Sequence, residues 1–110
     1  MYSYISHLEC SVCEKEYPHN QLSSISECCA KVLFARYDLQ KLKAEVDRGV
    51  YDSRDSNMWR FSELLPVTDP SKVVTLGEGG TPLLRANTLQ KKLNLKHLYI
   101  KDEGLNPTGT

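Results

Sequence analysis

The sequence predicts an α/β protein in which a small cysteine-bearing β head precedes the first elements of a larger fold. Two observations lead to this prediction. All four cysteines lie in the first third of the chain, which therefore differs in composition from the rest. A strand is expected at residues 97–101, but it has no obvious neighbour within residues 50–110. Because an isolated strand leaves its backbone donors and acceptors unsatisfied, the second half is expected to belong to an incomplete sheet.

The composition is that of an ordinary globular protein and argues against several functional classes. Of the 110 residues, 40% are hydrophobic and 25% are charged, and 14 basic residues balance 14 acidic ones. This balance provides no overall electrostatic attraction to nucleic acid or anionic lipid. No run reaches the ~20 apolar residues of a membrane span, and the N-terminal residues lack the layout of a signal peptide. We therefore expect a cytoplasmic protein with no nucleic-acid or membrane partner.

The head is expected to cover residues 1–37 and to contain two strands. Residues 2–8 and 32–37 are both rich in aromatic and β-branched side chains, which favour strands. Polar, turn-forming residues occupy most of the stretch at 18–27. The head is therefore predicted to be a small β unit with turns that carry the cysteines.

A helical connector is predicted over residues 38–66. Asp38 is a suitable N-cap for a helix that Gly49 is expected to end. One face of this helix carries Leu39, Leu42 and Val46. A second short helix is expected over residues 58–65, where Pro66 stops it.

The larger fold is predicted to begin within residues 67–110. An irregular connector rich in glycine and proline covers residues 66–82, and a helix follows at 86–93. The strand at 97–101 shows alternating apolar positions, and the polar loop 102–110 follows it.

The cysteines predict a structural zinc ion. Cys10 and Cys13 have the Cys-x-x-Cys spacing with which two thiolates hold one tetrahedral ion. Fourteen residues separate Cys13 from the second pair, close to the roughly 15–20 of a zinc ribbon. However, Cys28 and Cys29 are adjacent, and neighbouring side chains of an extended segment point to opposite faces. Two alternatives therefore stay open: His19 serves as the fourth ligand, or the head has lost its metal and buries its cysteines.

A compact turn is expected at residues 77–84, which read Gly-Glu-Gly-Gly-Thr-Pro-Leu-Leu. Its glycines allow positive φ and close backbone approach, and Thr81 offers a hydroxyl and an amide. The turn lacks the Lys-Ser/Thr pair of a Walker loop. It also lacks the third glycine and the preceding strand of a dinucleotide-binding fingerprint.

A second motif changes the interpretation of this turn. Residues 99–110 read Tyr-Ile-Lys-Asp-Glu-Gly-Leu-Asn-Pro-Thr-Gly-Thr, which is a strand followed by a polar loop. Together with residues 76–84, this run resembles the threonine synthase family of fold-type II pyridoxal-phosphate enzymes. Residues 35–39 and 58–66 fit the same family, so the resemblance covers nearly the whole chain.

The resemblance implies a tryptophan synthase β-like catalytic fold that starts at residue 67. It also implies a lyase of threonine biosynthesis, which uses pyridoxal phosphate to eliminate phosphate from O-phosphohomoserine and add water, giving threonine. In the family, an aromatic residue and the Schiff-base lysine follow the Asn-Pro-Thr-Gly loop, and none of the nine lysines here lies at an equivalent place. Residues 1–110 alone are therefore expected to have no catalytic residue and no activity, and the remainder of the catalytic domain is the expected partner.

The resemblance also implies which residues line the cleft for a small phosphorylated amino acid. Hydroxyls and backbone amides there can hold a phosphate or a carboxylate. The candidates are Thr81, Asn106, Thr108 and Thr110. Lys101 is expected to face solvent or an acidic partner, and Asp102 and Glu103 are interpreted as surface charge.

Two interpretations without enzymatic activity stay open. The chain is then a zinc-ribbon interaction module with a helical tail, or a structural fragment that docks onto the rest of an enzyme. An unfinished sheet exposes an edge and apolar surface, which also favours self-association.

Overall fold

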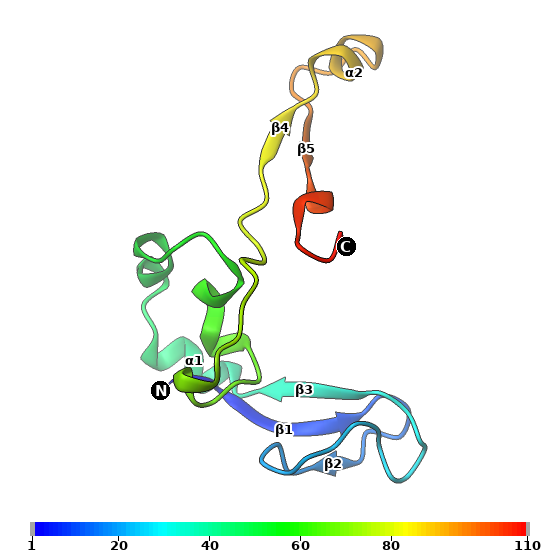
Figure 1. The fold of residues 1–110 in the computed structure, drawn as a ribbon, viewed down its shortest axis with the longest axis vertical. Helices are drawn as coiled ribbons and strands as arrows, with labels where there is room; N and C mark the ends of the chain where they lie inside the picture. The colour runs from blue at the N-terminus through cyan, green and yellow to red at the C-terminus, as the bar shows by residue number, and fades with distance from the viewer. Residues whose placement is uncertain (1, 110) are drawn as a thin grey trace. The chain divides into compact units, whose positions relative to one another are not determined.

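The computed structural model describes residues 2–109, and they form two units (Figure 1). The first unit comprises the described residues up to Asp55 together with Trp59–Val73. The second comprises Ser56–Met58 together with the described residues from Val74 onward. Within residues 2–109, no helix is long and apolar enough to cross a membrane. The sequence predicted domain boundaries after residues 37 and 66, and these boundaries stay predictions.

The first unit contains a three-stranded antiparallel sheet with the order β2-β1-β3 (Figure 1). Its strands are β1 (Ile5–Cys10), β2 (Glu16–Tyr17) and β3 (Leu33–Tyr37). Both strands predicted for the head are confirmed, although β1 begins and ends later than expected. The sequence analysis missed β2, because two residues are too few to show an alternating pattern. At the end of the sheet Cys10 pairs with Leu33, so the ladder closes where the first cysteine begins its turn.

Helix α1 (Leu39–Glu45) begins where the sequence indicated. The Asp38 carboxylate accepts a hydrogen bond of 2.9 Å from the Lys41 backbone N–H, which satisfies one of the free donors at the helix start. Of the predicted apolar face, Leu42 and Val46 are half-buried and Leu39 stays exposed.

The prediction that Gly49 ends this helix is wrong. Val46 already has an extended backbone, and Asp47 then caps a separate 3₁₀ helix, η1 (Arg48–Ser53). The Asp47 carboxylate accepts a hydrogen bond of 2.6 Å from the Gly49 N–H. Aspartate competes for backbone donors and so favours caps over helix interiors. Asp47 therefore interrupts a helix that the apolar periodicity alone would extend.

The next two helical segments are also 3₁₀ helices. The second predicted helix is found as η2 (Met58–Leu64), with a non-helical backbone at Phe61 that kinks it. A third, η3 (Pro70–Lys72), lies in the predicted irregular connector and is capped by the Asp69 carboxylate. The connector thus has short regular turns that its proline content did not reveal.

Polar groups fix the centre of the first unit. Glu63 is 4% exposed, and its two carboxylate oxygens accept hydrogen bonds from the Arg54 guanidinium at 2.6 and 2.8 Å. Arg54 also donates to the Arg60 carbonyl oxygen at 2.6 Å. The Arg54 guanidinium lowers the pKa of Glu63, so the buried carboxyl group is held in its charged form. This pair takes the central place that apolar side chains usually occupy.

Tyr4 connects this pair to the sheet and to helix α1. Its N–H donates to the Glu63 carbonyl oxygen at 2.9 Å, and its own carbonyl accepts from the Asp38 N–H at 2.9 Å. Its hydroxyl donates to the Glu45 carboxylate at 2.9 Å. Tyr4 is 3% exposed, so these bonds form around one of the few buried apolar side chains.

The second unit contains a two-stranded antiparallel ribbon of β4 (Leu83–Arg85) and β5 (Tyr99–Lys101). The expectation that the strand near residue 100 lacks a neighbour is therefore wrong. Its neighbour β4 was not predicted, because three residues are too few to show a strand pattern. Helix α2 (Asn87–Lys92), which connects the two strands, confirms the helix predicted there (Figure 1). A 3₁₀ turn, η4 (Glu103–Leu105), follows β5.

Replacing Arg54 by methionine would leave the Glu63 carboxylate buried without its two-point partner. We expect the free energy of unfolding at pH 7 to fall by roughly 2–3 kcal/mol, because removing one member of a buried pair strands a charge. Urea unfolding followed by Trp59 fluorescence measures this loss. The matched control Arg48→Met, at an exposed position, should change stability by less than about 0.5 kcal/mol.

The same substitution has a pH signature. Because the folded pKa of Glu63 is lowered, its stabilising effect is complete above the unfolded value of about 4.3 and is lost as the pH falls through the folded pKa. The difference between the native chain and Arg54→Met should therefore shrink in acid. A difference that stays constant down to pH 3 would contradict this account of the pair.

Candidate functional site

The four cysteines predicted as metal ligands meet beside the end of β1. Their Sγ atoms all lie within 4.8 Å of one another, and those of Cys13 and Cys28 are 3.2 Å apart. A tetrahedral zinc ion with Zn–S bonds of about 2.3 Å separates its sulfur atoms by about 3.8 Å. The arrangement therefore fits four thiolates around one ion. The group consists of Cys10, Cys13, Cys28 and Cys29, and His19 is not part of it.

The first two thiols sit on a tight turn at residues 10–15. The Cys10 N–H donates to the Lys15 carbonyl at 2.9 Å, and the Glu14 N–H donates to the Cys10 carbonyl at 3.1 Å. Glu14 has a φ of 61°, a left-handed conformation that glycine adopts more readily. The turn thus keeps its shape with a glutamate where glycine would be less strained.

A second turn, at residues 26–31, repeats this hydrogen-bond pattern. The Ser26 N–H donates to the Lys31 carbonyl at 2.8 Å, and the Ala30 N–H donates to the Ser26 carbonyl at 2.8 Å. Ala30 has a φ of 51°, as Glu14 does at the matching place. Residues 26–31 are therefore the structural equivalent of residues 10–15.

This equivalence shows that Ser26 occupies the place of Cys10, and Cys29 the place of Cys13. Ser26 is fully buried, and its hydroxyl oxygen accepts hydrogen bonds from the Cys10 thiol at 3.3 Å and from the Lys31 N–H at 3.0 Å. The sequence analysis missed Ser26. The signal that would have found it is the shared pattern x-x-Cys-x-Lys, repeated after 16 residues.

The fourth thiol comes from Cys28, at the position that Val12 has in the first turn. The objection that adjacent cysteines face opposite ways assumed an extended segment. The structure shows a turn at Cys28 and Cys29 instead, so the alternation of a strand does not apply. The Cys28 N–H is held by the Tyr17 hydroxyl oxygen at 3.1 Å, which ties this turn to β2.

The thiols differ in acidity because they share hydrogen bonds. The backbone N–H of Cys13 is the largest of several contacts that lower the pKa of Cys10 to about 6. The Tyr17 hydroxyl lowers the pKa of Cys28, while hydrogen bonds to Cys13 and Cys28 raise that of Cys29. Because thiolates are the form that binds metal, a divalent cation would displace the remaining protons from this cluster.

The glycine-rich turn of the second unit packs against the segment that leads into η2. The Met58 N–H donates to the Glu78 carbonyl at 2.8 Å. A Cβ atom on Gly79 would lie 2.6 Å from the Met58 nitrogen, and one on Gly80 would lie 1.8 Å from the Ser56 carbonyl oxygen. These two positions also have φ of +81° and +62°, so both space and conformation require glycine.

A polar network connects this turn to the loop after β5. The Glu103 carboxylate accepts hydrogen bonds from the Thr81 hydroxyl at 2.8 Å and from the Asn106 amide at 2.9 Å. The Asn106 Oδ1 accepts in turn from the Gly79 N–H at 3.0 Å. The Lys101 ammonium donates to the Thr81 carbonyl and lies 4.0 Å from the Glu103 carboxylate. The network joins the two motifs that carry the family resemblance.

The structure thus brings two of the four predicted cleft residues together. Thr81 is 8% exposed and Asn106 is half-buried, whereas Thr108 is exposed in the following loop. Thr110 lies outside the described residues. Lys101 meets an acidic partner, as expected, but the interpretation of Glu103 as surface charge is incomplete because two side chains bind its carboxylate. Whether these residues line a cleft stays a prediction.

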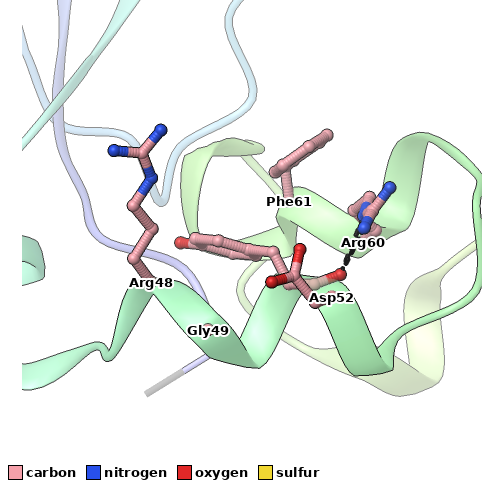
Figure 2. Close-up of a pocket in the computed structure, with 6 residues that line it drawn as sticks. Arg48, Gly49, Asp52, Arg60 and Phe61 are labelled. Carbon is pink, nitrogen blue, oxygen red and sulfur yellow. Dashed lines mark hydrogen bonds between the residues drawn. The ribbon is translucent and has the colours of Figure 1, made fainter.

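The first unit also has a hollow of about 560 Å³ at its surface (Figure 2). Its lining residues are Arg48, Gly49, Tyr51, Asp52, Arg60 and Phe61. The Arg60 Nε donates to the Tyr51 carbonyl at 3.0 Å, and the rings of Tyr51 and Phe61 lie 5.3 Å apart. These contacts hold η2 against η1, at a place where the sequence analysis predicted no functional residue.

Comparison with known proteins identifies the relatives of this chain. A threonine synthase of Methanocaldococcus jannaschii is 44% identical over 101 residues, which are 92% of this chain and 25% of the relative. The chain is homologous to the N-terminal quarter of threonine synthases. The threonine synthase of Methanosarcina acetivorans is 35% identical over 104 residues, which are 94% of this chain and 25% of that relative.

A third threonine synthase, from Halalkalibacterium halodurans, is 44% identical over 59 residues, which are 49% of this chain and 16% of the relative. No family model and no solved structure matches the chain. The chain spans about a quarter of the length of the two archaeal threonine synthases. The resemblance drawn from residues 76–84 and 99–110 is thus confirmed.

Substitution of Gly80 by alanine tests the packing of the glycine-rich turn. The new methyl group would meet the Ser56 carbonyl, so we expect the Met58–Glu78 hydrogen bond to loosen. The amide hydrogen-exchange rate of Met58, measured by NMR, should rise at least about tenfold, or ~1.4 kcal/mol of local stability. Gly77→Ala is the matched control, since Gly77 also has positive φ but nothing lies near its Cβ position. Equal effects of both substitutions would show that backbone conformation, not close packing, sets the requirement.

Proposed function

We propose that residues 1–110 are the N-terminal part of a threonine synthase-like lyase that acts on O-phosphohomoserine and releases threonine and phosphate. The homology over 92% of the chain carries this proposal. Pyridoxal phosphate supplies the electron sink for such a reaction when bound. In the family the Schiff-base lysine follows the Asn-Pro-Thr-Gly loop. The 110 residues by themselves are therefore proposed to be inactive, and the complete enzyme is proposed to act in the cytoplasm.

The part of this chain in the reaction is to present polar groups to the substrate. The loop after β5 and the glycine-rich turn are linked through Glu103 and Asn106, which supports their assignment to one site. Amide groups and free hydroxyls at such a place bind the phosphate or carboxylate of a phosphorylated amino acid, while the Thr81 hydroxyl gives its proton to Glu103. The residues assigned to the cleft are Thr81, Asn106, Thr108 and Thr110.

The remainder of the catalytic domain is the proposed partner of the second unit. All side chains of β4 and β5 are exposed, including the apolar Leu83, Leu84, Tyr99 and Ile100. A two-stranded ribbon is only marginally stable in water and needs further strands or helices to cover it. Self-association of the chain through the same ribbon is the alternative.

We also propose that the cysteine cluster binds one structural zinc ion. The donor set supports this, because four sulfur atoms within 4.8 Å of one another can fill every coordination position of a tetrahedral ion. A zinc ion with no open position stabilises the fold and takes no part in the reaction. Such an ion would join the two equivalent turns, which backbone hydrogen bonds shape separately.

A second candidate function is that of a zinc-ribbon interaction module without enzymatic activity. The observation that favours it is that the three-stranded sheet and all four thiols lie within the first unit. A head of this kind needs nothing from the second unit to bind metal. The two candidates differ in whether the second unit serves a catalytic cleft.

A chimeric enzyme separates the two candidates. Residues 1–110 replace the matching N-terminal quarter of the Methanocaldococcus jannaschii threonine synthase, and phosphate release from O-phosphohomoserine is measured. We expect kcat/KM within about tenfold of the intact relative, or ~1.4 kcal/mol of transition-state stabilisation. The relative without its N-terminal quarter is the control and should release no phosphate. A folded chimera that binds pyridoxal phosphate but is inactive would contradict the lyase proposal and favour the interaction module.

Metal titration of the 110-residue chain tests the zinc proposal. We expect about one zinc ion per chain, and cobalt substitution should give the absorption bands of a tetrahedral thiolate site. Cys28→Ala should weaken zinc binding by roughly two orders of magnitude, because it removes one of four ligands. Adding Ser26→Cys to that variant should restore affinity, since residue 26 holds the place of Cys10. His19→Ala is the matched control and should bind zinc like the native chain.

The opposite results are equally informative. A chain that takes up no zinc would support a head that has lost its metal, although only Cys10 of the four cysteines is buried and Cys13 and Cys28 are exposed. Zinc binding that Cys28→Ala leaves unchanged would show that Cys28 is not the fourth ligand. Loss of affinity in His19→Ala would bring back the histidine alternative.

A further inference from the structure

Glu103 is the residue at which the two predicted cleft segments meet. One of its carboxylate oxygens lies 2.8 Å from the Thr81 hydroxyl and the other lies 2.9 Å from the Asn106 Nδ2. Thr81 belongs to the glycine-rich turn and Asn106 to the loop after β5, so a single side chain connects segments 22 residues apart. The cleft assignment uses Glu103 only as evidence that the two segments are linked and gives it no role in the reaction.

The chemistry of this contact requires a carboxylate. Both partners donate: the Thr81 hydroxyl gives its proton to Oε1, and the Asn106 amide gives one to Oε2. A glutamine at this position has one acceptor oxygen, and its amide group would place a donor against a donor. An aspartate is shorter by one methylene group, so its carboxylate would lie further from both partners. Glutamate therefore accepts from both donors better than glutamine or aspartate would.

The carboxylate also sets the orientation of the Asn106 side chain. Because the Asn106 Nδ2 faces Glu103, its Oδ1 is turned to the Gly79 N–H at 3.0 Å. Lys101 holds the Thr81 carbonyl and lies near the Glu103 carboxylate, so Thr81 is fixed at both its hydroxyl and its backbone. The result is a chain of contacts from Glu103 through Asn106 to the backbone of the glycine-rich turn.

We propose that Glu103 is a positioning residue of the cleft, which locks the glycine-rich turn to the Asn-Pro-Thr-Gly loop through the Thr81 hydroxyl and the Asn106 amide. Glu103 acts on the reaction through these two side chains and does not itself contact the substrate. This inference rests on the proposed function, because the relative placement of the two segments matters to the reaction only if both segments contact a substrate. Small misplacements of binding groups cost large factors in rate.

Hydrogen exchange in the 110-residue chain tests the contact itself. In Glu103→Gln we expect the exchange rate of the Gly79 amide to rise at least about fivefold, because Asn106 loses the partner that orients it. Asp102→Asn is the matched control, since it removes the same charge from the neighbouring residue, whose carboxylate does not cap η4. It should leave the Gly79 amide within about twofold of the native rate. The Met58 amide, bound to Glu78, reports in both variants whether the turn remains folded.

The chimeric enzyme tests the consequence for the reaction. Glu103→Gln should lower kcat/KM for phosphate release at least about tenfold, mainly through kcat, because the bound substrate is misplaced. Asp102→Asn should stay within about twofold. Thr81→Val, which removes the donated proton but keeps the shape, should lower kcat like Glu103→Gln, whereas Thr81→Ser should retain most of it.

Each other outcome overturns the inference. An unchanged Gly79 exchange rate in Glu103→Gln would show that Glu103 does not orient Asn106. Faster exchange with kcat/KM equal to that of Asp102→Asn would reduce Glu103 to a structural contact. An unsubstituted chimera that folds and binds pyridoxal phosphate but is inactive would refute the proposed function and the positioning role of Glu103 with it. The exchange data would still decide whether the contact exists.

Discussion

The two-point ion pair between Arg54 and Glu63 is the interaction on which the first unit depends. Few apolar side chains are buried among the described residues, so a core of the usual kind does not hold the segments together. The Glu63 carbonyl accepts from Tyr4, which begins the path into β1, and β1 leads directly to Cys10. The first cysteine turn is thus linked through β1 and Tyr4 to the segment that carries the buried carboxylate. An ion pair with two hydrogen bonds fixes the orientation of its side chains, whereas apolar packing only brings side chains close together.

The regular elements of this chain were predictable where they are long enough to show a pattern. Strand β3 and helices α1 and α2 were predictable from the types of their side chains, and the start of α1 also from capping by Asp38. The cysteine cluster was predictable from the spacing of the cysteines. Strands β2 and β4 could not be predicted, because two or three residues show no alternation. Glu103 was underestimated since its partners are distant in sequence, and no local pattern distinguishes a carboxylate that binds two side chains from one that faces solvent.

The two candidate sites both depend on a tight turn with positive φ, but different residues adopt this conformation. In both, a tight turn with positive φ places polar or thiol groups closer together than a strand or helix would allow. In the second unit, Gly79 and Gly80 provide this conformation, because neighbouring backbone leaves no room for a side chain. In the head, Glu14 and Ala30 adopt it at a conformational cost, because residues with a Cβ atom rarely take a positive φ. A bound zinc ion would offset that cost, whereas hydrogen bonds to Glu103 and Asn106 hold the glycine-rich turn.

The equivalence of Ser26 and Cys10 has a consequence for how such a head can change over generations. Serine and cysteine codons differ by a single base, and Cys28 already supplies a thiol from the same turn. A chain with cysteine at both 26 and 28 would hold one thiol in reserve, so either could then be lost without harm. The fourth ligand can therefore move two residues along the chain in two single-base steps, with four thiols present throughout. The hydrogen-bond pattern of the turn would stay the same through such a change, while the order of its cysteines would not.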